Sequence, residues 1–197
     1  MQLKYIGIFI IGYLMQMYLC ELMVNRGYKL TKKNINITSL ITGLTLIYIS
    51  CLKIDPISFI VYFVTIIITI NITIIDLKFT YIPIELNKAL LIIGAINALI
   101  NYENIINYIG AFIIAGAAFW ILAIVTGLGG GDVKLIAAIG LIVGYNSIIF
   151  IMCSSYIIGA IVGISLLIMR RKKLVSILPF APFITISTIL CFMVGLK

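Results

Sequence analysis

The chain has 197 residues, of which 63% are hydrophobic and 10% are charged, and its mean hydropathy is +1.27. This composition excludes a soluble globular domain, whose interior is too small to bury so many apolar side chains, and predicts an integral membrane protein. The absence of histidine excludes a Ser-His or Cys-His nucleophile pair, and the net charge of +8 comes from short basic clusters between apolar runs, a pattern typical of membrane orientation signals rather than of nucleic-acid binding.

Apolar runs and short polar loops alternate through the first half of the chain. A helix needs about 20 apolar residues to cross a bilayer, and the first runs cover residues 5–24, 37–52 and 57–75. A polar loop at 25–36 separates the first two, and a turn at 53–56 places Pro56 where a helix begins readily. The third run ends at Asp76. Because Pro83 disfavours helix at the residue before it, we expect a loop over residues 77–87.

The second half contains five more apolar runs, two of which are short for a membrane span. They cover residues 89–100, 105–126, 133–143, 148–169 and 174–196. The sequence therefore predicts an all-α, polytopic membrane helix bundle of about eight transmembrane segments, with residues 1–197 as one integral membrane domain. Glycines spaced four apart are typical of helix packing, and the chain has two such pairs, Gly140 with Gly144 and Gly159 with Gly163.

The basic clusters at residues 26–33 and 170–173 predict how the helices are oriented. Both clusters fall on the cytoplasmic side if the N-terminus is outside, as the positive-inside rule requires. Asp76 and Asp132 then lie on the cytoplasmic side of a multi-pass cell-membrane protein. Asp55 and Glu103 lie on the outer side.

Asp76 and Asp132 are the two acidic residues that this topology favours for chemistry. Of the six acidic residues, these two lie at helix ends of the same depth, so they can meet in a bundle. Two aspartates that share one proton supply an acid and a base, which together activate a water. The dipole of the sixth helix favours the ionised form of Asp132. That helix of about 11 residues covers only roughly half of a ~30 Å core, so we expect Asp132 in a water-filled recess.

The run Gly129-Gly130-Gly131 precedes Asp132 and has a physical role in this hypothesis. Glycine adopts positive φ values without strain and lets the backbone approach a peptide substrate closely. The residues alone leave other interpretations open. Asp132 is also a typical helix N-cap, Asp76 a typical solvated loop residue, and intramembrane carboxylates also carry ions or protons in transporters. Two carboxylates make a sparse metal site, so we expect neither a metal nor a cofactor.

The chain resembles the type IV prepilin peptidases and the related archaeal preflagellin peptidases, which are membrane aspartyl proteases with a GxGD motif. Residues Gly129-Gly130-Gly131-Asp132 match that motif and continue into Val133-Lys134. The first aspartate of the family is followed by Ile-Pro, as Asp76 is followed here by Ile82-Pro83. Pro179-Phe180-Ala181-Pro182 is similar to the family's PFGP segment, with Ala181 in place of glycine. The resemblance covers about residues 57–196.

The resemblance implies an aspartic-type endopeptidase that removes the short basic leader of a prepilin-like precursor, on the cytoplasmic side and just before the precursor's apolar helix. Asp76 and Asp132 are the catalytic residues that carry over. The candidates for substrate binding or the active-site loop are Gly129, Gly130, Gly131, Lys134, Ile82, Pro83 and Glu85. Glu21 and Glu85 offer negative charge to a basic leader. The expected partners are the precursor and the lipid bilayer.

One departure from the family concerns a second activity. Bifunctional members carry a cysteine-containing cytoplasmic domain after the first helix, and they methylate the new N-terminus with S-adenosylmethionine. Residues 25–36 occupy that place here and contain no cysteine. We therefore expect a peptidase that lacks the methyltransferase activity or performs it with a much reduced apparatus.

Overall fold

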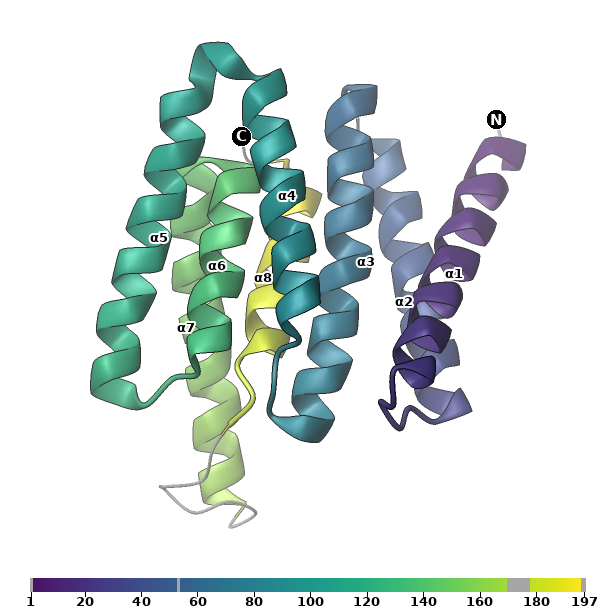
Figure 1. Ribbon diagram of the computed structural model, residues 1–197. Coiled ribbons are helices and arrows are strands. Elements are labelled where there is room, and N and C mark those ends of the chain that lie inside the picture. Colours follow the sequence, from purple (N-terminus) through teal and green to yellow (C-terminus); the bar gives the residue numbers. More distant parts are fainter. Residues whose placement is uncertain (1, 53, 170–177, 196–197) are drawn as a thin grey trace.

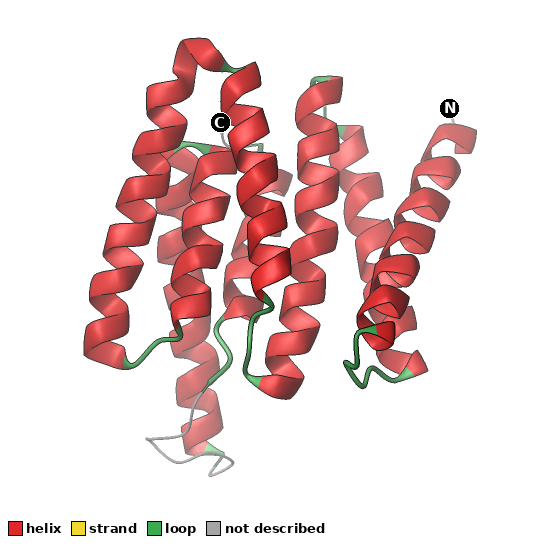
Figure 2. Cartoon of the chain, viewed as in Figure 1, coloured by secondary structure: helices red, strands yellow, loops and turns green. Residues whose placement is uncertain are grey.

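The computed structural model describes residues 2–52, 54–169 and 178–195, and every regular element in those ranges is a helix (Figure 2). The elements, in chain order, are α1 (Gln2–Asn25), α2 (Lys32–Cys51), α3 (Pro56–Phe79), α4 (Ile84–Ile100), the short 3-10 helix η1 (Tyr102–Asn104), α5 (Ile105–Thr126), α6 (Gly130–Val143), α7 (Tyr145–Ile168) and α8 (Ala181–Val194). The predicted all-α fold class is confirmed.

Five of the described helical segments are long and apolar enough to cross a bilayer. They are Tyr5–Asn25 of α1, then α2, α3, the segment Tyr102–Thr126 that contains α5, and α7. Helix α8 is a shorter apolar helix, and α4 and α6 have 17 and 14 residues. The protein is a polytopic helical membrane protein.

The connections between the helices gather at the two ends of the bundle (Figure 1). The loops that follow α1, α3 and α5 lie at the lower end of Figure 1, and η1 lies at the upper end. Asp55 caps the start of α3 at that upper end, and Glu103 is part of η1. The predicted separation of these two acids from Asp76 is therefore confirmed. The predicted basic cluster at 170–173 and Lys53 lie outside the described residues.

Helix α6 lies between α4 and α5 and in front of α7 in the view of Figure 1, and α8 packs between α7 and α3. Helices α1 and α2 pack against each other and join the bundle through α3. Isoleucine and leucine side chains of α3 and α6 form much of the fully buried core, among them Ile66, Ile72, Ile75, Leu135, Ile136 and Ile139. The two helices that carry Asp76 and Asp132 thus contribute many of the fully buried side chains.

The glycine pairs contribute to this packing only in part. A Cβ at Gly140 would lie 2.8 Å from the carbonyl oxygen of Ala111, so α5 and α6 approach backbone to backbone there. Gly159 similarly makes room for the ring of Phe183 on α8. Gly144, in contrast, ends α6 with a φ of 81°, and no described atom lies within 4 Å of a Cβ placed at Gly163. The packing role is confirmed for Gly140 and Gly159. It is also confirmed for Gly144, where a Cβ would lie 2.7 Å from the side-chain nitrogen of Asn107 on α5, but not for Gly163.

Several predicted helix boundaries near the two aspartates are wrong by about a turn. Helix α3 does not end at Asp76 but continues to Phe79, and α4 begins at Ile84 inside the predicted loop. Helix α6 begins at Gly130, ahead of Asp132, rather than after it. A charged residue was expected at the end of each apolar helix, whereas both aspartates are buried within helical turns. The described part of the last run is helical only from Ala181.

Candidate active site

Asp76 lies in the last turns of α3, where its side chain is only 4% exposed. Its Oδ2 accepts a hydrogen bond from the backbone N–H of Ala181, at 3.1 Å, and Ala181 is the first residue of α8. The free N–H groups and dipole of a helix N-terminus stabilise a carboxylate placed there. Asp76 is therefore a buried carboxylate held by another helix, which excludes its interpretation as a solvated loop residue.

The placement of α8 against α3 is secured by a hydroxyl bridge. The hydroxyl of Thr185 donates to the carbonyl oxygen of Thr69 at 3.1 Å, and the hydroxyl of Thr73 donates to the Thr185 oxygen at 2.8 Å. All three residues lie within two to three turns of the contact between Asp76 and Ala181 on their helices. A buried hydroxyl without a hydrogen-bond partner destabilises the folded protein. The bridge therefore holds the N-terminal end of α8 in place against Asp76.

Asp132 lies in the first turn of α6, and its side chain is 7% exposed. The helix N-cap is Gly129, not Asp132, and the Asp132 backbone N–H bonds to the carbonyl oxygen of Gly129 at 3.0 Å. Its Oδ1 is buried without a hydrogen-bond partner among the described residues. Asp132 therefore is not the helix cap that the sequence left open as an alternative.

The two carboxylates face one cleft at the lower end of the bundle. Its volume is about 370 Å³, and both carboxylates are part of its wall. The lining residues come from α3, α4, α6 and the loops that join them, namely Asp76, Thr80, Tyr81, Ile82, Ile84, Asn87, Gly129, Gly130, Gly131, Asp132 and Lys134. Two buried carboxylates on the wall of one cleft are placed to exchange protons with a group bound between them.

From the sequence alone, the helix dipole favoured Asp132 as the ionised aspartate. In the structure, the helix dipole does not distinguish the two aspartates. Asp76 lies at the N-terminus of α8 as Asp132 lies at that of α6. Among the residues that the structure describes, Asp76 accepts a backbone N–H hydrogen bond from such a helix end and Asp132 does not. A charge-assisted bond of this kind is stronger than a neutral one, so the structure favours the negative charge on Asp76.

The glycine run provides close packing rather than unusual backbone angles. Gly129 has a φ of −65°, and neither it nor Gly130 nor Gly131 is among the positive-φ residues, so the predicted positive φ values are wrong. A Cβ at Gly131 would lie 3.0 Å from the Cβ of Ile82, and one at Gly129 would lie 3.2 Å from Oδ2 of Asp132. No described atom lies within 4 Å of a Cβ at Gly130. Two of the three positions therefore need glycine for space.

Asn87 is a cleft residue that the sequence did not identify. Its Nδ2 donates to the carbonyl oxygen of Gly131 at 3.1 Å, which ties the first turn of α4 to the first turn of α6. Its Oδ1 is buried and has no partner among the described residues. Since a buried amide oxygen without a donor costs free energy, this atom is suited to receive an N–H from a bound chain.

Two further features of the site have no signal in the sequence. The Ala181 contact is made by a backbone amide, which the residue type does not reveal. Tyr156 of α7 packs its ring against Phe119 and Phe180, and its buried hydroxyl has no hydrogen-bond partner among the described residues. A tyrosine within an apolar run is usually a packing residue, so its spacing gave no indication of this position.

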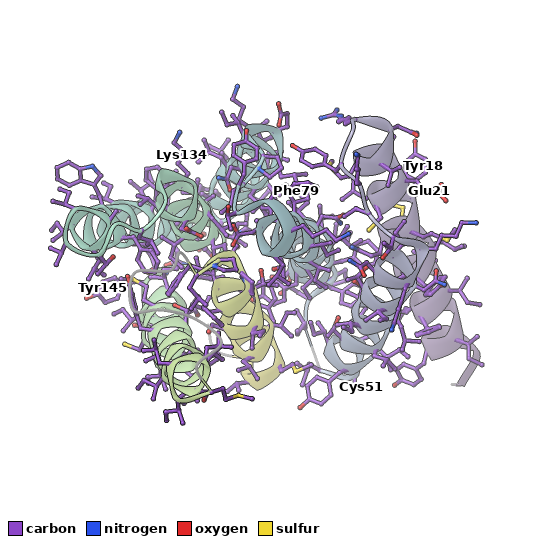
Figure 3. All side chains as sticks on the ribbon, turned by 90° about the horizontal axis from the view of Figure 1, so that it is seen from below. Tyr18, Glu21, Cys51, Phe79, Lys134 and Tyr145 are labelled. Atoms are coloured by element: carbon purple, nitrogen blue, oxygen red, sulfur yellow. The ribbon has the colours of Figure 1, made fainter. Side chains whose placement is uncertain are left out.

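The structure brings most of the predicted site residues into the cleft, but not all of them. Pro83 and Glu85 line a neighbouring cavity of about 180 Å³ with Met23, Arg26 and Tyr28. Figure 3 views the bundle from this end and shows Glu21 on α1, across the molecule from Lys134. Glu21 is thus separated from the cleft by α3. Among the described residues, no group of three or more histidine, cysteine or acidic side chains is placed to hold a metal ion.

Comparisons with known proteins place this arrangement in a family. The profile of the type IV leader peptidase family matches residues 63–164, which include both aspartates. The chain is 29% identical over 128 residues to a prepilin leader peptidase/N-methyltransferase of Aeromonas salmonicida, a match that covers 61% of this chain and 44% of that protein. Proteins of the same description from Bacillus subtilis (strain 168) and Legionella pneumophila are 36% and 30% identical over 86 and 139 residues.

These matches cover 41% and 65% of this chain, and 35% and 47% of the two relatives. The chain thus matches less than half of the length of each of these three relatives. No solved structure matches it. Because the family profile covers more than half of the 197 residues, the chain belongs to the type IV leader peptidase family.

Proposed function

We propose that this protein is a membrane aspartyl endopeptidase that cleaves the short basic leader from type IV prepilin-like precursors. The observation that carries the proposal is the pair of buried carboxylates, Asp76 and Asp132, which come from two helices and line one cleft at a bundle end. Membership of the leader peptidase family supports this chemistry over ion or proton transport by the same two side chains.

The proposed reaction uses the two aspartates as base and acid. The ionised carboxylate takes a proton from a water, whose oxygen attacks the scissile carbonyl carbon. The other aspartate gives its proton to the carbonyl oxygen as the tetrahedral intermediate forms. Collapse of the intermediate breaks the C–N bond. The leaving amine takes up the proton that the base removed from the water, and a hydroxyl of the intermediate returns a proton to the other aspartate as the carboxyl product forms. The two carboxyl groups then share one proton as before.

The surroundings of the two aspartates support a specific division of these roles. Asp76 accepts the Ala181 N–H and faces the N-terminus of α8, which favours its ionised form as the base. Asp132 has a buried oxygen without a partner, which suits a protonated carboxyl that gives its proton to substrate. In the proposed cycle Asp76 therefore activates the water, and Asp132 is the acid.

The cleavage takes place at the cytoplasmic membrane boundary in this proposal. The cleft lies at the same bundle end as the loop between α1 and α2, which holds Arg26 and Lys29. The positive-inside rule assigns such a loop to the cytoplasm. An apolar precursor helix that leaves the membrane at that end presents its first peptide bonds at the depth of the cleft.

Methylation of the cleaved product is not part of the proposed activity. The connection between α1 and α2 consists of residues 26–31, between the end of α1 at Asn25 and the start of α2 at Lys32. Six residues do not form a domain with its own core. Transfer of a labelled methyl group from S-adenosylmethionine to the cleaved product would contradict this.

The experiment that tests the function is co-expression with a precursor that consists of a basic leader, a glycine and an apolar helix. The precursor is expected to become shorter on a gel, and mass spectrometry is expected to place its new N-terminus directly before the apolar helix. The same precursor expressed alone is the control. A precursor that keeps its full mass in the presence of the protein would contradict the proposed function.

A further inference from the structure

An apolar groove of about 610 Å³ opens on the face of the bundle that carries α4, α5 and α6. Its walls are made by residues such as Leu91 on α4, Phe112, Ala117 and Trp120 on α5, and Val133 and Ala137 on α6. The Trp120 side chain is 62% exposed, so the groove is open to the surroundings of the bundle. A concave apolar surface of this kind is typical of a binding site for an apolar segment.

The groove results from the way in which α4 and α5 pack. Both helices pack along α6 but make few contacts with each other. Near the upper end of the bundle they approach α6 closely, because Gly94 faces Leu141 and Gly140 faces the backbone of Ala111. Towards the cleft, small residues at Gly116, Ala117 and Ala137 leave the space between the helices unfilled. Along α5 the groove extends over residues 112–120, about 12 Å, or roughly two turns of a bound helix.

The groove is continuous with the cleft that holds the two aspartates. Ile84, Asn87 and Lys134 line both cavities. A chain that leaves the cleft past Asn87 therefore enters the groove directly. Asn87 is also the residue whose Oδ1 lacks a partner, so a backbone N–H of such a chain has an acceptor at the junction.

The lysines at the groove indicate which part of a precursor lies there, the basic leader or the segment after the cleaved bond. Lys88 and Lys134 line the groove, and Figure 3 shows Lys134 on that side of the bundle. Glu85 lines neither the groove nor the cleft but a separate cavity next to α1, together with Arg26. A basic leader is repelled by the two lysines at the groove, and the apolar walls of the groove suit the apolar segment that follows it. The segment that follows the cleavage point is therefore the one on the groove side.

We propose that the groove between α4, α5 and α6 binds the apolar helix of the precursor, on the carboxyl side of the cleaved bond. This inference rests on the proposed function. It adds a specificity determinant, because the groove selects substrates in which an apolar helix follows the cleavage point within the reach of Asn87. Helix burial against Ala117 and Trp120 then positions the scissile bond between Asp76 and Asp132.

Site-specific photo-crosslinking tests this docking directly. Benzoylphenylalanine replaces Trp120 in the full chain, which also carries Asp132→Asn so that the precursor stays intact. The matched control places the same residue at Ala160, an exposed position on α7 that does not line the groove. A crosslink from position 120 to the apolar helix of the precursor, and none from position 160, is expected. Crosslinks to phospholipid alone, or equal crosslinks from both positions, would overturn the proposal.

A kinetic comparison separates a docking defect from a folding defect. Ala117→Trp fills the groove, and Ala160→Trp adds the same side chain to α7. Two substrates are compared, namely the full-length precursor and a peptide that ends a few residues after the cleaved bond. For Ala117→Trp, we expect a loss of about tenfold or more in cleavage of the full-length precursor, several times the loss with the peptide. Equal losses with both substrates would overturn the proposal.

The two tests also separate this inference from the proposed function. If the unmodified protein cleaves neither substrate, the proposed function itself is wrong. If it cleaves both, but position 120 never contacts the apolar helix, the endopeptidase proposal stands and the groove inference is wrong.

Discussion

At the scale of single residues, the site depends on small distances around Asp132. Gly131 lies against Ile82 and Gly129 against the Asp132 carboxylate, so the glycine run brings the loop after α3 into contact with the first turn of α6. Gly130, between them, faces open space. The three glycines therefore have different structural roles, although they are adjacent and identical in the sequence.

This difference predicts the effect of three alanine substitutions. Gly131→Ala forces Ile82 to move, at a cost of about 1–3 kcal/mol, and we expect about a tenfold loss of precursor cleavage. Gly129→Ala is expected to act similarly, through the displaced carboxylate. Gly130→Ala is the matched control and is expected to retain most of the activity. The initial rate of cleavage by the purified variants checks this, and equal losses at positions 130 and 131 would contradict it.

The residue types predicted the two aspartates but not the atoms around them. Asp76 and Asp132 were identifiable because a carboxylate within an apolar sequence is costly and rarely present without a role. The Ala181 contact was not identifiable, since a backbone amide is common to nearly all residues and its direction depends on the packing of α8. Asn87 was missed for a related reason, because it lies in a stretch that the sequence suggested to be a loop.

At the scale of elements, α8 is the helix that completes the site. Its N-terminal amide reaches Asp76, and the Thr185 hydroxyl bridge holds it against α3. Helix α6 is the short element on which Asp132 is placed, and it is packed between α4 and α5. The site is therefore formed by helices that are distant in the sequence.

Removal of the Thr185 hydroxyl is expected to affect both stability and activity. Thr185→Val leaves the Thr73 hydroxyl without its acceptor and should lower the free energy of unfolding by about 1–3 kcal/mol. It should also lower the cleavage rate, since the amide that faces Asp76 is no longer held in place. Thermal unfolding in detergent and the cleavage rate are both measured.

Thr188→Val is the matched control for this substitution. Thr188 is equally buried, but its hydroxyl donates only to the carbonyl oxygen of Ile184 in its own helix, at 2.8 Å. It is expected to leave the cleavage rate close to that of the unmodified protein. Equal effects of the two substitutions on the cleavage rate would show that the bridge does not position the site.

The number and order of helices could be predicted from the apolar runs, whereas their ends near the site could not. Residues 105–126 were predicted as a helix and form α5 with the same bounds. The start of α6 was displaced, because Gly129 rather than Asp132 is its N-cap. The end of α3 was displaced, because the Ala181 amide of α8 compensates the burial of Asp76. Such compensation depends on tertiary contacts that a single run of residues does not contain.

At the scale of the whole molecule, the helix arrangement places the two cleft aspartates at one end of the bundle and Glu103 at the other. The cleft and the loop after α1 lie at one end of the bundle, and Glu103 lies at the other. The proposed orientation assigns the first end to the cytoplasm. On that end, Lys134 lines the cleft and the groove, and Glu85 lines a separate cavity together with Arg26.

The orientation is testable with two single cysteines. Glu103→Cys is expected to react with a membrane-impermeant maleimide in intact cells. Leu128→Cys, in the loop between α5 and α6, is expected to react only after the membrane is permeabilised. The unmodified chain provides the background from its own four cysteines. The reverse labelling pattern would contradict the orientation.

The charge arrangement predicts how Glu85 affects substrate use. Glu85→Lys should repel a basic leader and raise KM by about fivefold at low salt, a range typical of exposed charge interactions. Because salt screens exposed charges, the effect should shrink at high ionic strength. Glu85→Gln is the control that removes the charge without reversing it. An unchanged KM of Glu85→Lys for a precursor with a basic leader would show that Glu85 does not contribute to leader binding.

The central claim is that the Asp76 and Asp132 pair performs the cleavage, and co-expression of matched variants with a precursor tests it most directly. Asp76→Asn and Asp132→Asn are each expected to lower cleavage by at least about a hundredfold, while the protein stays in the membrane at its normal level. Glu103→Gln, an equally conservative change at the far end of the bundle, is expected to cleave normally. Full cleavage by either aspartate variant would contradict the mechanism.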